Sequence, residues 1–323
     1  MLNGNITDVP GIQVGNVENL EALTGCTVIL AEEGAVCGVD VRGSAPGTRE
    51  TDLLDPVNLV DQVHAICLSG GSAYGLESAT GVMHFLEEKG IGLDVGVARV
   101  PIVPGAVLFD LAIGDPKVRP DKEMGYTAAS RAKKGEFPFG NIGAGCGATV
   151  GKMAGNDSCM KGGLGSASVS LDNGLVVGAL VAVNAVGDIR DPDNREILAG
   201  MIDPKTGEFR DSLLYLEKGM DNNSMAGANT TIGLVAVNAE LTKAEAKKIA
   251  QITQNALART TYPAHTMLDG DTIFTLATKG KKYNVDLIGN IAAKVMEEAI
   301  IAAIKEADAV AGIPSYKSMN AQS

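Results

Sequence analysis

The dipeptide Asn229-Thr230 has a layout that could support self-cleavage. It stands where a small, polar segment meets an apolar, β-branched one, residues 232–237, whose composition favours a buried strand. Hydrolysis of this peptide bond would leave a free amine and a hydroxyl on Thr230. One residue would then supply both a nucleophile and a base, as in hydrolases with an N-terminal threonine. An ordinary strand that opens after a turn explains the same dipeptide, so the rest of the chain must decide.

Four other positions carry side chains that could serve such a site. Asn184 ends a long apolar segment, and a buried amide there must act either as a structural cap or as a donor facing a site. Lys152 lies in a glycine-rich, apolar segment, which argues against a solvated surface lysine. Asp269 and Asp271 are two residues apart, so in an extended segment they point to the same side. A turn-capping or calcium-like role is the alternative for this Asp-Gly-Asp.

The composition excludes several classes of protein. The chain has 323 residues, of which 45% are hydrophobic and 20% charged, a balance typical of a globular protein with a large core. Its formal net charge of −12 disfavours a nucleic-acid partner, because phosphate binding needs clustered lysine and arginine. Neither a membrane-spanning run nor a signal-peptide pattern is visible, so we expect a cytoplasmic protein without membrane contact.

The residue types that bind metals or form disulfides are scattered. Neither a C-x-x-C pair nor an H-E-x-x-H pattern occurs, so we expect no disulfide framework, no metal and no cofactor. A triad that uses a histidine is left open. The residues concerned are Cys26, Cys37, Cys67, Cys146, Cys159, His64, His84 and His265.

Glycine is unusually frequent, with 40 residues, and it clusters beside apolar segments at 70–75, 143–151 and 162–165. Such clusters indicate either close packing between layers or tight turns near a site. The first follows an apolar strand, residues 63–68, and precedes a helix. That arrangement can bind phosphate, but G-x-G-x-x-G is absent, and a turn beside an active site explains it as well.

Strand signals dominate the first two thirds of the chain. Residues 27–30 and 35–41 predict two strands joined as a hairpin. Asn173-Gly174 predicts a type I′ turn between strands at 166–171 and 175–184, the second buried on both faces. A further strand is expected at 106–113. The polar residues 185–228 favour a surface linker with one short helix at 212–218.

Helix signals dominate the remainder. Thr242 and Glu245 form a capping box that opens a helix ending before Pro263. A strand is expected at 272–277, and a last helix at 285–307 with an apolar face. Strands with helices before and after them predict stacked layers, with helices outside and sheets inside.

Five segments, in this order along the chain, resemble the self-processing N-terminal-nucleophile aminopeptidases. That family includes the L-aminopeptidase/D-esterase-amidases, the β-peptidyl aminopeptidases and the nylon-oligomer hydrolase. The segments are residues 6–15, 64–76, 143–152, 229–231 and 268–272. Each is weak evidence alone, but their order is specific, and together they extend over nearly the whole chain.

The resemblance implies an α+β fold, a four-layer αββα sandwich of the type shared with ornithine acetyltransferase. It implies one catalytic domain, 1–323, that cuts itself between Asn229 and Thr230 into an α chain, 1–229, and a β chain, 230–323. The family commonly forms tetramers, so a homotetramer is expected. Several relatives have serine as the new terminus, whereas Thr230 matches the nylon-oligomer branch.

The resemblance also implies catalytic roles. The Thr230 hydroxyl would attack the substrate carbonyl, and its α-amine, whose pKa is ordinarily about 7.7–8.0, would take the proton. The Asn184 amide would stabilise the oxyanion, and Tyr126 would line the site near it. Lys152, as a nearby ammonium, would lower the pKa of the Thr230 amine.

By the same resemblance, Asp269 and Asp271 would orient the Thr230 amine and Lys152, or receive a substrate ammonium. Some relatives carry serine and glutamate at these two places, so substrate preference stays open.

The predicted function is hydrolysis, without metal or cofactor, of N-terminal residues from short peptides, amino-acid amides or esters. Two alternatives belong to other classes. One is acyl transfer from acetylornithine to glutamate, because ornithine acetyltransferase has this fold and is also cut before a threonine. The other is a non-catalytic protein that binds a small ligand at its glycine turns, for which the chain would stay intact.

Overall fold

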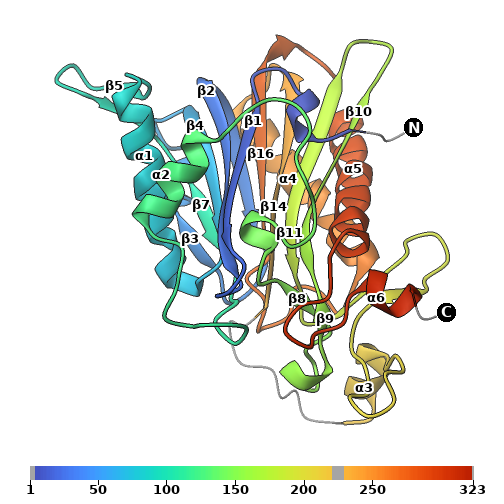
Figure 1. The fold of residues 1–323 in the computed structure, drawn as a ribbon. Helices are drawn as coiled ribbons and strands as arrows, with labels where there is room; N and C mark the ends of the chain where they lie inside the picture. The colour runs from blue at the N-terminus through green and yellow to red at the C-terminus, as the bar shows by residue number, and fades with distance from the viewer. Residues whose placement is uncertain (1–3, 220–228, 322–323) are drawn as a thin grey trace.

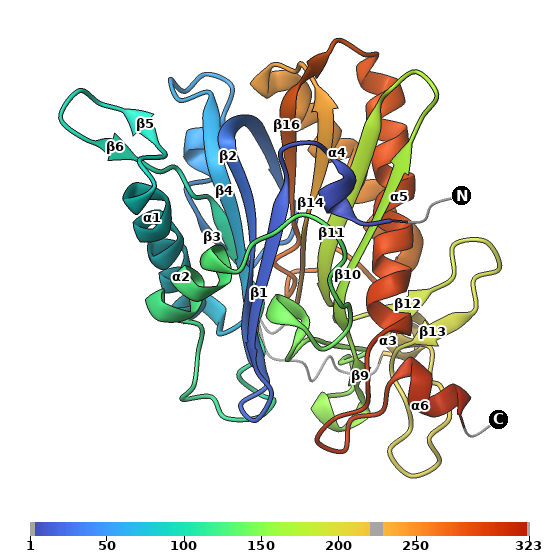
Figure 2. The ribbon, with the colours of Figure 1, turned by 45° about the horizontal axis from the view of Figure 1, so that its top comes forward.

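The computed structural model describes residues 4–219 and 229–321, and its elements form four layers (Figure 1). Helices α1 (Ser78–Glu88) and α2 (Lys122–Ser130) cover one side of the molecule. Helices α4 (Lys243–Thr260) and α5 (Val285–Lys305) cover the other, and the strands lie between the two pairs (Figures 1 and 2). This arrangement confirms the expected α+β sandwich with helices outside.

Most strands belong to one nine-stranded sheet. Its order is β10 (Gly163–Ser170), β11 (Val176–Asn184), β14 (Thr230–Ala239), β16 (Thr272–Lys281), β2 (Thr24–Val41), β4 (Gln62–Ser69), β7 (Gly105–Val107) and β3 (Gly47–Arg49), and β1 (Gln13–Asn19) pairs with β2. The β14–β16 and β4–β7 pairs are parallel, and the other pairs are antiparallel.

Strand β2 connects the two inner layers. Its first part, up to Leu30, pairs with β1, and its last part, from Val36, pairs with β16, while β4 pairs with residues 26–30 and 35–36. The predicted hairpin at 27–41 is therefore wrong. Gly34, with a φ of 78°, marks an irregularity within one strand rather than a reversal of the chain. The two inner layers are parts of one continuous sheet.

Three apolar cores separate the four layers. The middle core contains Ile29, Ile66, Leu180, Leu234 and Phe274, from both halves of the sheet. Successive residues of one strand face different cores: Leu180 and Leu234 enter the middle core, whereas Val181 and Val235 pack under α4 and α5. The prediction that 175–184 is buried on both faces is thus confirmed. A third core lies beneath α1 and α2 and includes Val82 and Leu86.

Close packing explains part of the glycine content. A Cβ atom on Gly165, in β10, would lie 2.1 Å from the carbonyl oxygen of Ala299, in α5. The absence of a side chain therefore lets the helix backbone approach the strand.

The segment after β11 is folded, so the surface-linker prediction is wrong for residues 185–219, although the short helix predicted at 212–218 is confirmed. Strand β12 (Asp188–Arg190) pairs with β13 (Ile197–Ala199) and with β15 (Thr261–Tyr262), and α3 (Ser212–Glu217) follows. The buried Asp188 carboxylate accepts hydrogen bonds from the Met201 and Ser212 main-chain N–H groups, both at 2.8 Å. The polar residues that led to the linker prediction lie in turns between these short elements. Residues 220–228 of the prediction fall outside the described part.

Other local predictions have mixed outcomes. The β10–β11 hairpin is confirmed, but only Gly174 of the turn pair has a positive φ, and Gly174 N–H donates to the Leu171 carbonyl at 2.9 Å. This is a longer loop than a type I′ turn. The strand expected at 106–113 ends at Val107. The capping box of Thr242 and Glu245 is confirmed at the start of α4.

The remaining elements are small. They are the paired strands β5 (Leu93–Asp94) and β6 (Arg99–Val100), the paired strands β8 (Thr149–Val150) and β9 (Met160–Lys161), helix α6 (Tyr316–Asn320), and 3-10 turns at Ile6–Asp8, Asp52–Leu54, Ser72–Glu77, Gly143–Gly145 and Asn156–Ser158. Within residues 4–219 and 229–321, no helix has both the length and the apolar character needed to cross a membrane.

Candidate active site

Thr230 is the first residue of β14 and is buried. The antiparallel register of β11 and β14 places Asn184 directly opposite it. The preceding residue, Asn229, forms a parallel bridge with Asp269, just before β16. Three of the predicted segments, distant in sequence, therefore meet at one end of the sheet.

The carbonyl oxygen of Asn229 accepts two hydrogen bonds. The main-chain N–H of Gly270 donates to it at 2.9 Å, and the Thr230 hydroxyl also donates to it. Asn229 is fully buried. In the continuous chain, the candidate nucleophile thus lies against the carbonyl group of the peptide bond that self-cleavage would break.

The Asn184 side chain is fixed through both of its polar atoms. Its Oδ1 accepts from the Thr149 N–H at 2.9 Å and from the Lys152 ammonium at 2.8 Å, and its Nδ2 donates to the Phe109 carbonyl at 3.1 Å. Lys152 Nζ also lies 3.1 Å from the Asn184 carbonyl oxygen. Lys152 and Asn184 thus form one hydrogen-bonded unit opposite Thr230.

Burial decides the protonation state of Lys152. The side chain is almost wholly inaccessible, and the loss of hydration lowers the pKa of its ammonium to about 7. The negative charge of Asp269 opposes this shift but does not cancel it. The neutral amine of Lys152 is therefore accessible near neutral pH. The sequence prediction treated this residue as an ammonium, whereas the structure gives it a second possible role as proton acceptor.

The two carboxylates have different partners. Asp269 Oδ2 accepts from the N–H and the hydroxyl of Thr266, both at 2.7 Å. Asp271 Oδ1 accepts from the Thr231 N–H at 2.8 Å, and its Oδ2 lies 2.9 Å from Nδ1 of His265. Burial, and next the charge of Asp271, raise the pKa of Asp269 to about 6. Asp271 thus holds the start of β14, while Asp269 can exchange a proton near neutral pH.

Tyr126 is placed apart from this cluster. Its hydroxyl donates to Glu88 Oε2 at 2.7 Å, and its ring packs edge-on against Phe85 of α1. Helix α2, which carries Tyr126, covers the outside of the sheet (Figure 1). The structure therefore brings together every predicted site residue except Tyr126. The aromatic residue beside Asn184 is Phe109, through its carbonyl oxygen.

Four further contributors were not predicted: Thr149, Phe109, His265 and Gly270. Three of them act through main-chain atoms, which no side-chain pattern in a sequence reveals. His265 precedes Asp271 by six residues, a spacing with no established meaning for catalysis. Only its short distance from the Asp-Gly-Asp segment could have suggested it.

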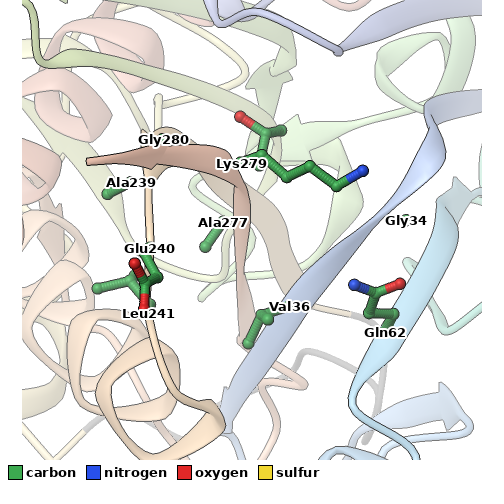
Figure 3. Close-up of a pocket in the computed structure, with 10 residues that line it drawn as sticks. Gly34, Val36, Gln62, Ala239, Glu240, Leu241, Ala277, Lys279 and Gly280 are labelled. Atoms are coloured by element: carbon green, nitrogen blue, oxygen red, sulfur yellow. The ribbon is translucent and has the colours of Figure 1, made fainter. Parts of the chain in front are cut away.

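A separate cavity lies far from Thr230. It has a volume of about 290 Å³ and is lined by Gln62, Ala239, Glu240 and Lys279, among others (Figure 3). Thr230 and Ala239 are the two ends of β14, and a strand rises about 3.3 Å per residue, so the cavity is roughly 30 Å from Thr230. It does not belong to the candidate site.

Residues 4–317 match the model of Peptidase family S58. The chain belongs to this family. The match extends over nearly all of the described residues and includes every residue of the cluster around Thr230.

Relatives of this S58 chain include named enzymes. An uncharacterized aminopeptidase of Mycobacterium leprae is 40% identical, over 98% of this chain and 94% of the relative. A 6-aminohexanoate-oligomer endohydrolase of Kocuria sp. is 34% identical, over 92% of this chain and 85% of the relative. The family and these relatives make the chain a hydrolase of peptide or amide bonds.

Solved structures confirm the fold. The L-aminopeptidase D-Ala-esterase/amidase of Ochrobactrum anthropi superposes with a TM-score of 0.73 at 16% identity, over 98% of this chain and 93% of that one. A β-aminopeptidase of Burkholderia sp. superposes with a TM-score of 0.65 at 21% identity, over 95% and 89%. The S58 chain thus has the N-terminal-nucleophile hydrolase fold variant attributed to the first of these proteins.

Proposed function

We propose that this S58 chain is a self-cleaving hydrolase whose nucleophile is Thr230. Cleavage at Asn229–Thr230 would divide its single domain into an α chain, 1–229, and a β chain, 230–323. The mature enzyme would remove N-terminal residues from short peptides, amino-acid amides or esters. The observation that carries the proposal is the contact between the Thr230 hydroxyl and the carbonyl oxygen of Asn229, in a fully buried setting.

After cleavage, Thr230 would carry both groups that turnover needs, its hydroxyl and a free α-amine. Its hydroxyl would attack the carbonyl carbon of the substrate, and its new α-amine would accept the hydroxyl proton and later pass it to the leaving amine. The Asn184 amide, fixed opposite Thr230, would stabilise negative charge on the substrate oxygen. Lys152, with a pKa near 7, would tune or share the proton transfer.

The two buried carboxylates support a substrate with a free amine. Asp269 and Asp271 lie beside Asn229 and Thr231 and carry negative charge into a site with little solvent. A substrate ammonium placed near them would be attracted strongly, because burial weakens screening. This suits an aminopeptidase, whose substrates carry an ammonium group close to the scissile carbonyl.

The identity to 6-aminohexanoate-oligomer endohydrolases favours a second substrate class, linear ω-amino amides. Such substrates carry the same terminal ammonium on a longer apolar chain. We therefore include 6-aminohexanoate oligomers beside aminoacyl amides in the substrate test.

The test of self-cleavage is the intact mass of the denatured, freshly purified protein. The unchanged protein is expected to give two masses, for 1–229 and 230–323. Thr230→Val removes only the hydroxyl and keeps the branched shape, and it is expected to give one mass. Thr230→Ser keeps a hydroxyl and should restore cleavage.

A matched control is available one residue away. Thr231→Val makes the same chemical change in a neighbouring buried residue of the same strand. It should cleave and hydrolyse substrate normally if the effect at Thr230 is chemical rather than structural. An uncut wild-type chain after long incubation, or an active Thr230→Val protein, would contradict the proposal.

A further inference from the structure

The carbonyl oxygen of Asn229 has a donor that the proposed function does not yet use. The main-chain N–H of Gly270 lies 2.9 Å from this oxygen, and the Thr230 hydroxyl meets the same atom. When a hydroxyl adds to a carbonyl carbon, negative charge develops on the carbonyl oxygen. A fixed N–H group at hydrogen-bond distance from that oxygen stabilises the charge as it forms.

The main chain on both sides of Gly270 is anchored. The Ala45 N–H donates to the Asp269 carbonyl at 2.9 Å, and the Arg42 N–H donates to the Asp271 carbonyl at 2.9 Å. Asp269 is also bridged to Asn229. The Gly270 N–H is therefore held in place before any reaction begins, so little reorganisation is needed when charge develops.

Space at the site requires glycine at this position. A Cβ atom on residue 270 would lie 2.8 Å from Thr230 Oγ1 and 2.8 Å from the Ala45 carbonyl oxygen. Any side chain would push the hydroxyl away from the Asn229 carbonyl or shift the loop at residue 45. The nucleophile and the N–H donor can both reach the same carbonyl group only because residue 270 has no side chain.

We propose that the Gly270 N–H is an oxyanion donor of the self-cleavage step. The inference rests on the proposed self-cleavage at Asn229–Thr230. The Thr230 oxygen would form a bond to the Asn229 carbonyl carbon, and its proton would pass to the Thr230 nitrogen. The C–N bond then breaks, which leaves an ester and a free α-amine. Water hydrolyses the ester, so the Asn229 carboxylate is released and the Thr230 hydroxyl is regenerated. In both steps the negative charge forms on the oxygen that Gly270 contacts.

The test replaces the Asp269–Gly270 amide with an ester, by introducing glycolic acid at position 270 of the full chain during cell-free synthesis. This change removes the N–H and adds no side chain. The matched control is the same replacement at Gly207, whose N–H donates to the Asp203 carbonyl at 2.8 Å in a remote turn. Gly270→Pro, made by ordinary expression, removes the same N–H but adds a Cβ and a ring, so Gly270→Ala, which adds a Cβ and keeps the N–H, is its steric reference. Cleavage is followed by intact mass, and folding by circular dichroism and melting temperature.

We expect the ester at 270 to fold like the control and to cleave about 10²–10³-fold more slowly, the cost typical of one lost oxyanion donor. A folded 270 ester that cleaves within about threefold of the 207 control would overturn the role of Gly270 and leave self-cleavage intact. If wild type and the 207 control both stay whole, self-cleavage itself is refuted, and with it this inference. If the 270 ester does not fold, the cleavage rates of folded Gly270→Pro and Gly270→Ala decide: a proline variant at least tenfold slower than the alanine variant supports the N–H role, and equal rates overturn it.

Discussion

Asn184 and Thr230 are cross-strand partners at the end where β11 finishes and β14 begins. Both strands are central in the nine-stranded sheet and are buried on both faces. Their relative position is therefore set by the ladder rather than by a loop, which suits a site that must hold two reacting groups in register. Lys152 is attached to the same unit by its hydrogen bond to Asn184.

Asn184→Asp is expected to impair catalysis without unfolding the protein. The change is nearly isosteric and keeps an oxygen for the Thr149 N–H and Lys152, but it replaces the N–H donor with an acceptor. We expect kcat for an aminoacyl amide to fall about 10²–10³-fold, with a smaller change in KM. Asn290→Asp, on the exposed face of α5, is the control for the added charge. Unchanged kcat in Asn184→Asp would rule out the oxyanion role.

Local patterns were enough to predict the elements that hold this site. The apolar run that ends at Asn184, the β-branched run after Thr230 and the capping box of α4 each follow from near neighbours in sequence. Strand β2 could not be predicted in the same way. Glu32-Glu33-Gly34 has the composition of a turn, and the chain continues as one strand because it pairs with β1 and β4 before this segment and with β4 and β16 after it.

The site residues also fall into those that the sequence could predict and those that depend on the fold. Side chains with rare chemistry, such as a lysine in a glycine-rich apolar segment, could be recognised, and so could two aspartates spaced two residues apart just before a strand. Tyr126 was assigned by resemblance alone, and the structure places it on α2, bonded to Glu88. Gly270 could not be found, because its contribution is a main-chain N–H whose direction depends on the fold.

Lys152 is expected to give the enzyme a pH dependence near neutrality. Because burial lowers its pKa to about 7, the neutral amine becomes the main form as the pH rises through 7. If that form accepts a proton, the rate of self-cleavage should increase through this range and then level off. Lys152→Arg keeps a permanent positive charge and should be slow at every pH. A normal rate in Lys152→Arg would show that a positive charge is sufficient.

Asp269→Asn is expected to stabilise the fold while it weakens catalysis. The pKa of Asp269 is raised from 3.8 to about 6, so between these values the folded chain binds more protons than the unfolded chain, and stability falls as the pH rises. Asparagine removes this loss and can still accept both hydrogen bonds from Thr266. The gain should be on the order of 2 kcal/mol above pH 6 and should shrink toward pH 4.

Urea unfolding at pH 4, 5, 6 and 7 measures this difference, with the exposed Asp172→Asn as control. Asp269→Asn, Asp172→Asn and their reference should all carry Thr230→Val as well, so that every sample contains one uncut chain. A stability gain that is the same at every pH would mean that ionisation of Asp269 is not its source.

His265 is expected to act on the site through Asp271, as a positioning residue. Its Nδ1 lies 2.9 Å from Asp271 Oδ2, and the other carboxylate oxygen holds the N–H of Thr231, next to the nucleophile. His265→Ala removes the side-chain contact and should lower kcat about ten- to a hundredfold, since one hydrogen bond to a charged group contributes about 1.5–3 kcal/mol. His265→Asn places an amide near the position of Nδ1 and also tolerates the positive φ of 56° at this residue. It should therefore recover much of the lost rate. If His265 had only a structural role, both variants would lose the same melting temperature, and His265→Asn would recover no kcat. The ratio of kcat in His265→Asn to kcat in His265→Ala therefore decides the role.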